Sequence, residues 1–160
     1  MKTAIYAGSF DPFTLGHLDI LKRALAIFDE VIVAIAKNAG KNPMFTFEER
    51  YELIAENIKD LKGAKIEILK GLTIDFAKKN NAVALIRGLR VMSDFEYEFQ
   101  LAQMNRHMNS EIETILLMPS SSYFFTSSTL IREVSHFNAD KIKDFVPKNV
   151  LKALIERNKQ

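Results

Sequence analysis

The residues best suited to chemistry lie in one segment, GSFDPFTLGH, which runs from Gly8 to His17. It follows a short apolar run and leads into an apolar-periodic stretch that predicts a helix. Backbone N–H groups at such a strand-to-helix turn, with the helix N-terminus behind them, attract phosphate. Ser9 and Thr14 contribute hydroxyl groups, and His17 contributes a donor that can carry a positive charge. The segment therefore predicts a nucleotide-binding site.

Three further groups of polar side chains follow other predicted strands. They are Lys37 and Lys41, then Arg87 and Arg90 on either side of Gly88, and finally Ser127, Ser128 and Thr129 at a predicted helix start. Cations, hydroxyl groups, backbone amides and one imidazole together suit a bound polyphosphate. These loops carry no acid pair, and no Ser-His-Asp or Cys-His set is apparent. The predicted chemistry is therefore phosphoryl-type transfer by positioning and charge stabilisation.

Each of these residues also has a simpler interpretation. His17 could serve only as a helix cap, and Ser127 to Thr129 could do the same for a later helix. Lys41 lies among glycine, asparagine and proline and could serve only solubility. Neither a P-loop nor a dinucleotide-binding glycine motif is present. The functional interpretation is favoured for His17 because a hydroxyl residue and a glycine precede it.

The elements that must position these residues alternate along the chain. Short, nearly continuous apolar runs predict buried strands at residues 3–6, 31–36, 65–69, 82–86 and 114–118. Helical patterns lie between and after them, at residues 17–28, from 46, at 73–79, 93–108, 128–136 and 148–157. Thr46 with Glu49, and Ser93 with Glu96, have the spacing of capping boxes.

This alternation predicts an α/β fold: a Rossmann-like, doubly wound, five-stranded parallel sheet with helices on both faces, formed by a single domain over residues 1–160. In such sheets ligands bind beyond the carboxyl ends of the strands, near the switch in strand order. We therefore expect the loops at residues 8–17, 37–43, 87–90 and 119–129 to surround one crevice.

Composition narrows the possible classes of protein. The chain has 160 residues and no cysteine, so disulfides and cysteine-based metal sites are excluded. The formal net charge is only +2, too small to predict a nucleic-acid-binding surface. The N-terminus enters a predicted strand at once, and no apolar run approaches the roughly 20 residues of a membrane helix. We expect a cytoplasmic protein that binds neither nucleic acid nor membrane.

Three segments resemble a known family. The segment from Gly8 to His17 is similar to the signature of the nucleotidyltransferase superfamily, which other adenylyl- and cytidylyltransferases share. The more specific segments are LIRGLRVMSDFEYEFQLAQMN at residues 85–105 and SSTLIRE at 127–133, supported by PMFTFEER at 43–50. Over essentially its whole length the chain resembles the phosphopantetheine adenylyltransferases.

The resemblance implies transfer of AMP from ATP to 4′-phosphopantetheine, giving dephospho-coenzyme A and pyrophosphate. It implies catalytic roles for His17, Lys41 and Arg90, with His17 stabilising charge on the α-phosphate. The implied ATP-binding residues are Ser9, Phe10, His17, Gly88, Leu89, Arg90, Glu98, Tyr123, Phe124, Phe125, Thr126, Ser127, Ser128 and Thr129. The implied phosphopantetheine-binding residues are Ser9, Lys41, Thr73 and Arg87. Ser9 stands where the family usually has threonine.

The resemblance also implies partners. Magnesium would be held mainly by the ATP phosphates, with no metal site made by the protein itself. Family members form homohexamers and are inhibited by coenzyme A, and we expect an apolar face of the helix at residues 93–108 to contact another subunit. Two alternatives stay open: a nicotinate-mononucleotide adenylyltransferase or glycerol-phosphate cytidylyltransferase, and a catalytically silent nucleotide-binding sensor.

Overall fold

The strands form one parallel sheet in the computed structural model, which describes residues 1–36 and 42–159. The described strands are β1 (Thr3–Gly8), β2 (Glu30–Ile35), β3 (Ala64–Ile68), β4 (Ala84–Gly88) and β5 (Glu113–Leu117). Their order is β3-β2-β1-β4-β5, and every neighbouring pair is parallel. The predicted doubly wound α/β sheet is confirmed. The order reverses at β1, which therefore lies at the switch point where ligands are expected.

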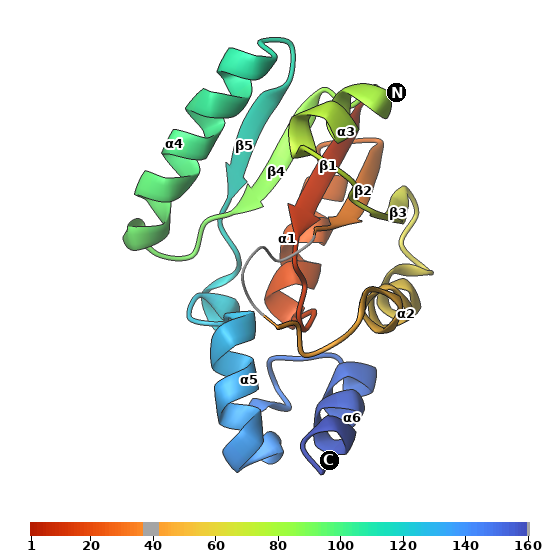
Figure 1. Ribbon diagram of the computed structural model, residues 1–160, viewed down its shortest axis with the longest axis vertical. Helices are drawn as coiled ribbons and strands as arrows, with labels where there is room; N and C mark the ends of the chain where they lie inside the picture. The colour runs from red at the N-terminus through yellow and green to blue at the C-terminus, as the bar shows by residue number, and fades with distance from the viewer. Residues whose placement is uncertain (37–41, 160) are drawn as a thin grey trace.

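Helices cover both faces of this sheet (Figure 1). They are α1 (Leu15–Leu25), α2 (Phe47–Ile58), α3 (Thr73–Lys79), α4 (Met92–Met108), α5 (Ser128–Phe137) and α6 (Lys148–Arg157), with short 3₁₀ turns η1 (Ser121–Tyr123) and η2 (Ala139–Ile142). Successive side chains of a strand point to opposite faces, so the sheet has two apolar cores. Tyr6 and Ile86 pack with α1, α2, α5 and α6, whereas Ile5 and Leu85 pack with α3.

One predicted helix start is confirmed and another is wrong. Thr46 caps α2, accepting the Glu49 N–H, while the Glu49 side chain accepts the Thr46 N–H. Ser93 does not cap α4, because that helix already begins at Met92 after Val91, and it has no side-chain cap. The Ser93–Glu96 spacing therefore falls inside the helix, where the same residue types have no capping role. Asp94 is the acidic residue in the first turn of α4.

Helix α4 differs from the other long helices in what it exposes. It runs beside β5 at the edge of the molecule (Figure 1), and its buried residues are the polar Glu98 and Asn105. Met92, Tyr97 and Phe99 are 80%, 64% and 50% exposed. Large apolar side chains thus lie on the outer surface of α4.

Candidate active site

A cavity of about 490 Å³ opens at the carboxyl ends of the strands. Three of the four predicted loops line it: the segment after β1, the residues after β4 and the loop after β5. Residues of the fourth, Lys37 and Lys41 among them, lie outside the described part of the chain, although Ala36 at its start lines the cavity. The structure thus brings together loops that are far apart in the sequence.

Most of the described residues predicted for the site line this cavity. They are Ser9, Phe10, His17, Thr73, Arg87, Gly88, Arg90, Glu98, Tyr123, Thr126, Ser127, Ser128 and Thr129. Among the described residues, Leu89, Phe124 and Phe125 are not part of the cavity wall. Phe125 instead packs edge-on against Phe145, with 5.3 Å between ring centroids.

The His17 ring is held in one orientation by the turn that precedes α1. Its Nδ1 lies 3.0 Å from the Thr14 N–H, and the Thr14 hydroxyl in turn accepts the His17 N–H. A histidine thus occupies the capping-box position usually filled by a glutamate. The ring is stacked on Phe13 and meets the edge of Phe10.

This environment fixes the charge and the tautomer of His17. Burial, reinforced by the positive charge of Arg90, lowers the pKa of His17 to about 3, so the imidazole is neutral near pH 7. Because the Thr14 N–H can only donate, Nδ1 accepts and the proton of the neutral ring is on Nε2. His17 therefore presents a neutral N–H donor, whereas the sequence analysis allowed for a charged one.

Arg87 forms a two-pronged ion pair inside the cavity wall. Its Nε and one terminal nitrogen each lie 2.8 Å from a different oxygen of Glu98, and its other terminal nitrogen donates to the Ala7 carbonyl. Burial lowers the pKa of Arg87, but the hydrogen bonds and charge of Glu98 outweigh it, and the pKa is raised. Both carboxylate oxygens of Glu98, which was predicted to contact ATP, thus accept hydrogen bonds from Arg87. Arg87 still has N–H groups that can donate to a ligand.

Arg90 lies across the mouth between two elements. Its Nε is 3.2 Å from Asp94 on α4, and a terminal nitrogen is 3.3 Å from the Thr126 carbonyl in the loop before α5. It is partly exposed and only loosely paired. Its charge is therefore accessible to an anion in the cavity.

Helix α5 directs its N-terminus into the cavity. Ser127 caps it by accepting the Leu130 N–H, and the Ser128 hydroxyl donates to the Pro12 carbonyl at 2.8 Å. The hydroxyl groups of Ser127 and Ser128 thus have structural partners. What the helix offers a ligand is its first backbone N–H groups and the positive end of its dipole.

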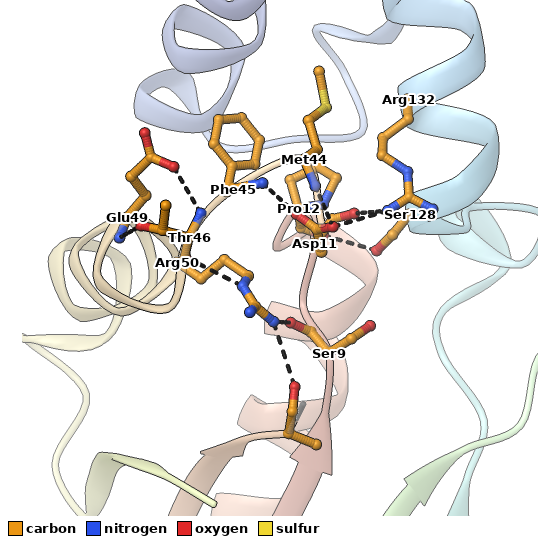
Figure 2. A network of polar contacts seen from close by, with 11 residues as sticks. Ser9, Asp11, Pro12, Met44, Phe45, Thr46, Glu49, Arg50, Ser128 and Arg132 are labelled. Atoms are coloured by element: carbon orange, nitrogen blue, oxygen red, sulfur yellow. Dashed lines mark hydrogen bonds and ion pairs between the residues drawn. The ribbon is translucent and has the colours of Figure 1, made fainter. Parts of the chain in front are cut away.

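The sequence analysis missed a network of buried charges behind the cavity (Figure 2). Asp11 is fully buried, and its carboxylate accepts the N–H groups of Met44 and Phe45 and pairs with Arg132 of α5 at 2.9 Å. Arg50 of α2 donates to the Ser9 and Ala36 carbonyls at 2.7 and 3.4 Å. No spacing in the sequence signals contacts between residues so far apart.

The chain matches the model of the cytidylyltransferase-like family over residues 5–134. A phosphopantetheine adenylyltransferase of Thermodesulfovibrio yellowstonii is 52% identical over 99% of this chain and 97% of its own. One of Syntrophus aciditrophicus is 49% identical over 98% and 94%.

Solved structures show the same fold at low identity. A Plasmodium falciparum nicotinic acid mononucleotide adenylyltransferase superposes with a TM-score of 0.70 at 19% identity, covering 99% of this chain and 97% of that one. The fold and the near-full-length identity agree: the chain belongs to the cytidylyltransferase-like family and, within it, to the phosphopantetheine adenylyltransferases.

Proposed function

We propose that this protein transfers the adenylyl group of ATP to 4′-phosphopantetheine, giving dephospho-coenzyme A and pyrophosphate in the penultimate step of coenzyme A biosynthesis. The observation that carries the proposal is the cavity in which His17, Arg87 and Arg90 converge with the N-terminus of α5. The relatives that match nearly the whole chain bear the name of this activity.

The reaction requires little covalent chemistry from the protein. An oxygen of the phosphopantetheine phosphate forms a bond to the α-phosphorus of ATP as the bond from that phosphorus to the bridging oxygen of pyrophosphate breaks. The attacking oxygen is already ionised at neutral pH, so no general base is needed. The main contribution to the activation barrier is the repulsion between two polyanions as they approach. Positive groups and N–H donors lower this barrier.

Individual residues have distinct tasks in this mechanism. The Nε2–H of His17 donates to the α-phosphate oxygen on which charge builds up. Arg90 and the residues from Tyr123 to Thr129 bind ATP, while Arg87, Thr73 and Lys41 bind phosphopantetheine. We propose that the Ser9 hydroxyl contacts both substrates.

We propose that magnesium is bound mainly by the ATP phosphates. In the described residues there is no cluster of three acidic or histidine side chains that could hold a metal ion. The acidic residues of the cavity wall, Asp94 and Glu98, are each paired with an arginine. This donor set suits a metal carried by the nucleotide, where it would neutralise phosphate charge.

The proposal extends to regulation and assembly. We propose a cytoplasmic homohexamer that coenzyme A inhibits by occupying the same cavity as the substrates. The exposed apolar side chains of α4 support the assembly. No helix in the described part of the chain has the length and apolar character needed to cross a membrane.

A substrate panel tests the proposal. Pyrophosphate release is measured with ATP, magnesium and phosphopantetheine, and in parallel with nicotinate mononucleotide, and with CTP and glycerol phosphate. We expect pyrophosphate release only in the reaction that contains phosphopantetheine as the acceptor. Preferred turnover of another acceptor would assign a related transferase, and ATP binding without turnover of any acceptor would indicate a silent sensor.

A further inference from the structure

Arg50 is a buried cation that the proposed mechanism does not use. It is 2% exposed, and burial lowers its pKa. Within the described chain no carboxylate lies within ion-pair distance of it. Its hydrogen-bond acceptors are the carbonyl oxygens of Thr46, Ser9 and Ala36, and its guanidinium lies 4.5 Å from the centre of the Phe47 ring. The charges of Asp11 and Glu48 raise the pKa of Arg50 but do not outweigh its burial. A buried charge whose direct hydrogen-bond partners are all neutral is costly, which points to a specific task.

The contacts at the end of β1 show what Arg50 does to the backbone. Carbonyl groups of successive strand residues face alternate neighbours. The Ala7 carbonyl accepts from Arg87 of β4, and the Gly8 carbonyl accepts the Ala36 N–H beyond β2. The alternation would next turn the Ser9 carbonyl towards β4. Instead that carbonyl faces Arg50, which also binds Ala36 on the β2 side.

The orientation of this carbonyl fixes the next N–H group. In a trans peptide the N–H points opposite to the C=O, so the Phe10 N–H is directed away from Arg50 and towards β4. That is the switch point, where Phe10 and Gly88 both line the cavity. Figure 2 shows the Ser9 hydroxyl also on the side away from Arg50.

Two observations indicate that this orientation has a use. No acceptor for the Phe10 N–H exists among the described residues, although Phe10 itself is buried. Phe10 also has a φ of +47°, a left-handed conformation that is rare for a bulky residue and persists only where the surroundings hold it. The fold thus maintains a strained residue whose N–H has no partner and is directed towards a cavity suited to anions.

We propose that Arg50 is a positioning residue: its guanidinium holds the Ser9 carbonyl out of the cavity and thereby directs the Phe10 N–H at a phosphate group of ATP. The inference rests on the proposed function only in taking ATP as the ligand. Loss of the guanidinium frees the Ser9–Phe10 peptide to rotate, which would replace a donor facing the phosphate by a carbonyl that repels it.

Comparing ATP with adenosine separates this role from general support of the fold. Equilibrium binding of each is measured without phosphopantetheine for the native protein and for Arg50→Lys. Lysine retains a charge but not the planar group whose Nε binds the Thr46 carbonyl while one terminal nitrogen binds those of Ser9 and Ala36. We expect the Kd for ATP to rise about tenfold, or about 1.4 kcal/mol, and the Kd for adenosine to stay within about twofold. The matched control is Ile54→Val, a buried change on the same helix, which should alter neither value.

Equal weakening of ATP and adenosine, or no weakening of either, would overturn the inference. If Arg50→Lys does not fold, Phe47→Leu decides instead, because it removes the ring beside the guanidinium and leaves the charge. It should weaken ATP binding about threefold and spare adenosine, and any other pattern counts against the proposal. A native protein that binds ATP but never turns over phosphopantetheine would refute the proposed function alone.

Discussion

At the scale of single residues, the neutral state of His17 is the feature with the clearest consequences. A partly buried imidazole that accepts from the Thr14 N–H has its proton on Nε2 before any substrate arrives. A preorganised donor of this kind needs no proton uptake during the reaction. Its contribution should therefore depend on geometry more than on pH.

Removing this donor should slow the chemical step. We expect His17→Ala to lower kcat by about 10²–10³, as loss of one oxyanion-type donor does, with a smaller effect on the KM for ATP. Steady-state pyrophosphate release measures both. His136→Ala, which removes an exposed histidine on α5, is the control and should retain full kcat. An unchanged kcat in His17→Ala would contradict the assigned role.

The protonation of His17 can be followed directly. Its folded pKa of about 3 lies below the ordinary value of 6.5, so between these pH values the unfolded chain binds the extra proton. The contribution of His17 to stability is therefore present above pH 6.5 and is lost as the pH falls towards 3. In ¹⁵N NMR spectra the ring should keep the neutral Nε2–H signature from pH 8 down to pH 5. A midpoint near pH 6.5 would show that the pKa is not lowered.

At the scale of elements, Asp11 connects three segments that carry the site. Its carboxylate accepts two N–H groups of the segment before α2 and pairs with Arg132 on α5 (Figure 2). The loop after β1 and the helix that points into the cavity are thus held by one buried group. The side-chain exposures are 1% for Asp11 and 20% for Arg132, so water screens this pair poorly.

Neutralising Asp11 should therefore destabilise the fold. We expect Asp11→Asn to lower the free energy of unfolding by about 3 kcal/mol or more, because it leaves Arg132 without its charge partner and weakens acceptance of two N–H groups. Glu113→Gln is the control: it breaks an exposed pair with Arg106 and should cost about 1 kcal/mol or less. Urea unfolding measures both, and similar small losses would argue against a clamp at Asp11.

The sequence predicted the elements better than their connections. Apolar runs gave each strand to within a few residues, and Thr46 with Glu49 located the start of α2, because these signals are local. Ser93 with Glu96 misled, because α4 already begins at Met92 after Val91 and has no side-chain cap. Residue type and position after a strand predicted Arg87 and Arg90 as site residues, but they did not predict which carboxylates pair with them.

Arg50 and Arg132 stayed undetected because each lies in an ordinary helical pattern. Arg132 and Asp11 are 121 residues apart, and only the folded topology brings them together. The neutral state of His17 was equally hidden, because burial cannot be judged from residue type. The family resemblance supplied the substrates, which neither local patterns nor the cavity alone identify.

At the scale of the whole molecule, the exposed apolar side of α4 is the surface most in need of a partner. Met92 and Phe99 are 80% and 50% exposed on it, and monomeric proteins rarely leave large apolar patches exposed. The proposed hexamer would cover these side chains.

Light scattering tests this assembly. We expect the native protein to have the mass of a hexamer and Phe99→Asp to have a lower mass, because a buried charge at the contact has no partner. Lys62→Asp, an exposed change in the turn before β3, should leave the assembly intact. A native protein that is monomeric would refute the proposed assembly.

The long-range contacts around the cavity also bear on the synthesis of the chain. The turn after β1 leaves the ribosome early. The ion pair of Asp11 cannot form until Arg132 has been synthesised, and the hydrogen bond accepted by Asp19 cannot form until Ser120, 101 residues further on, has been added. A nascent chain that ends before Ser120 already contains every strand of the described sheet, yet it lacks both this ion pair and this hydrogen bond. The polypeptide therefore completes the wall of the cavity only once the start of α5 has emerged.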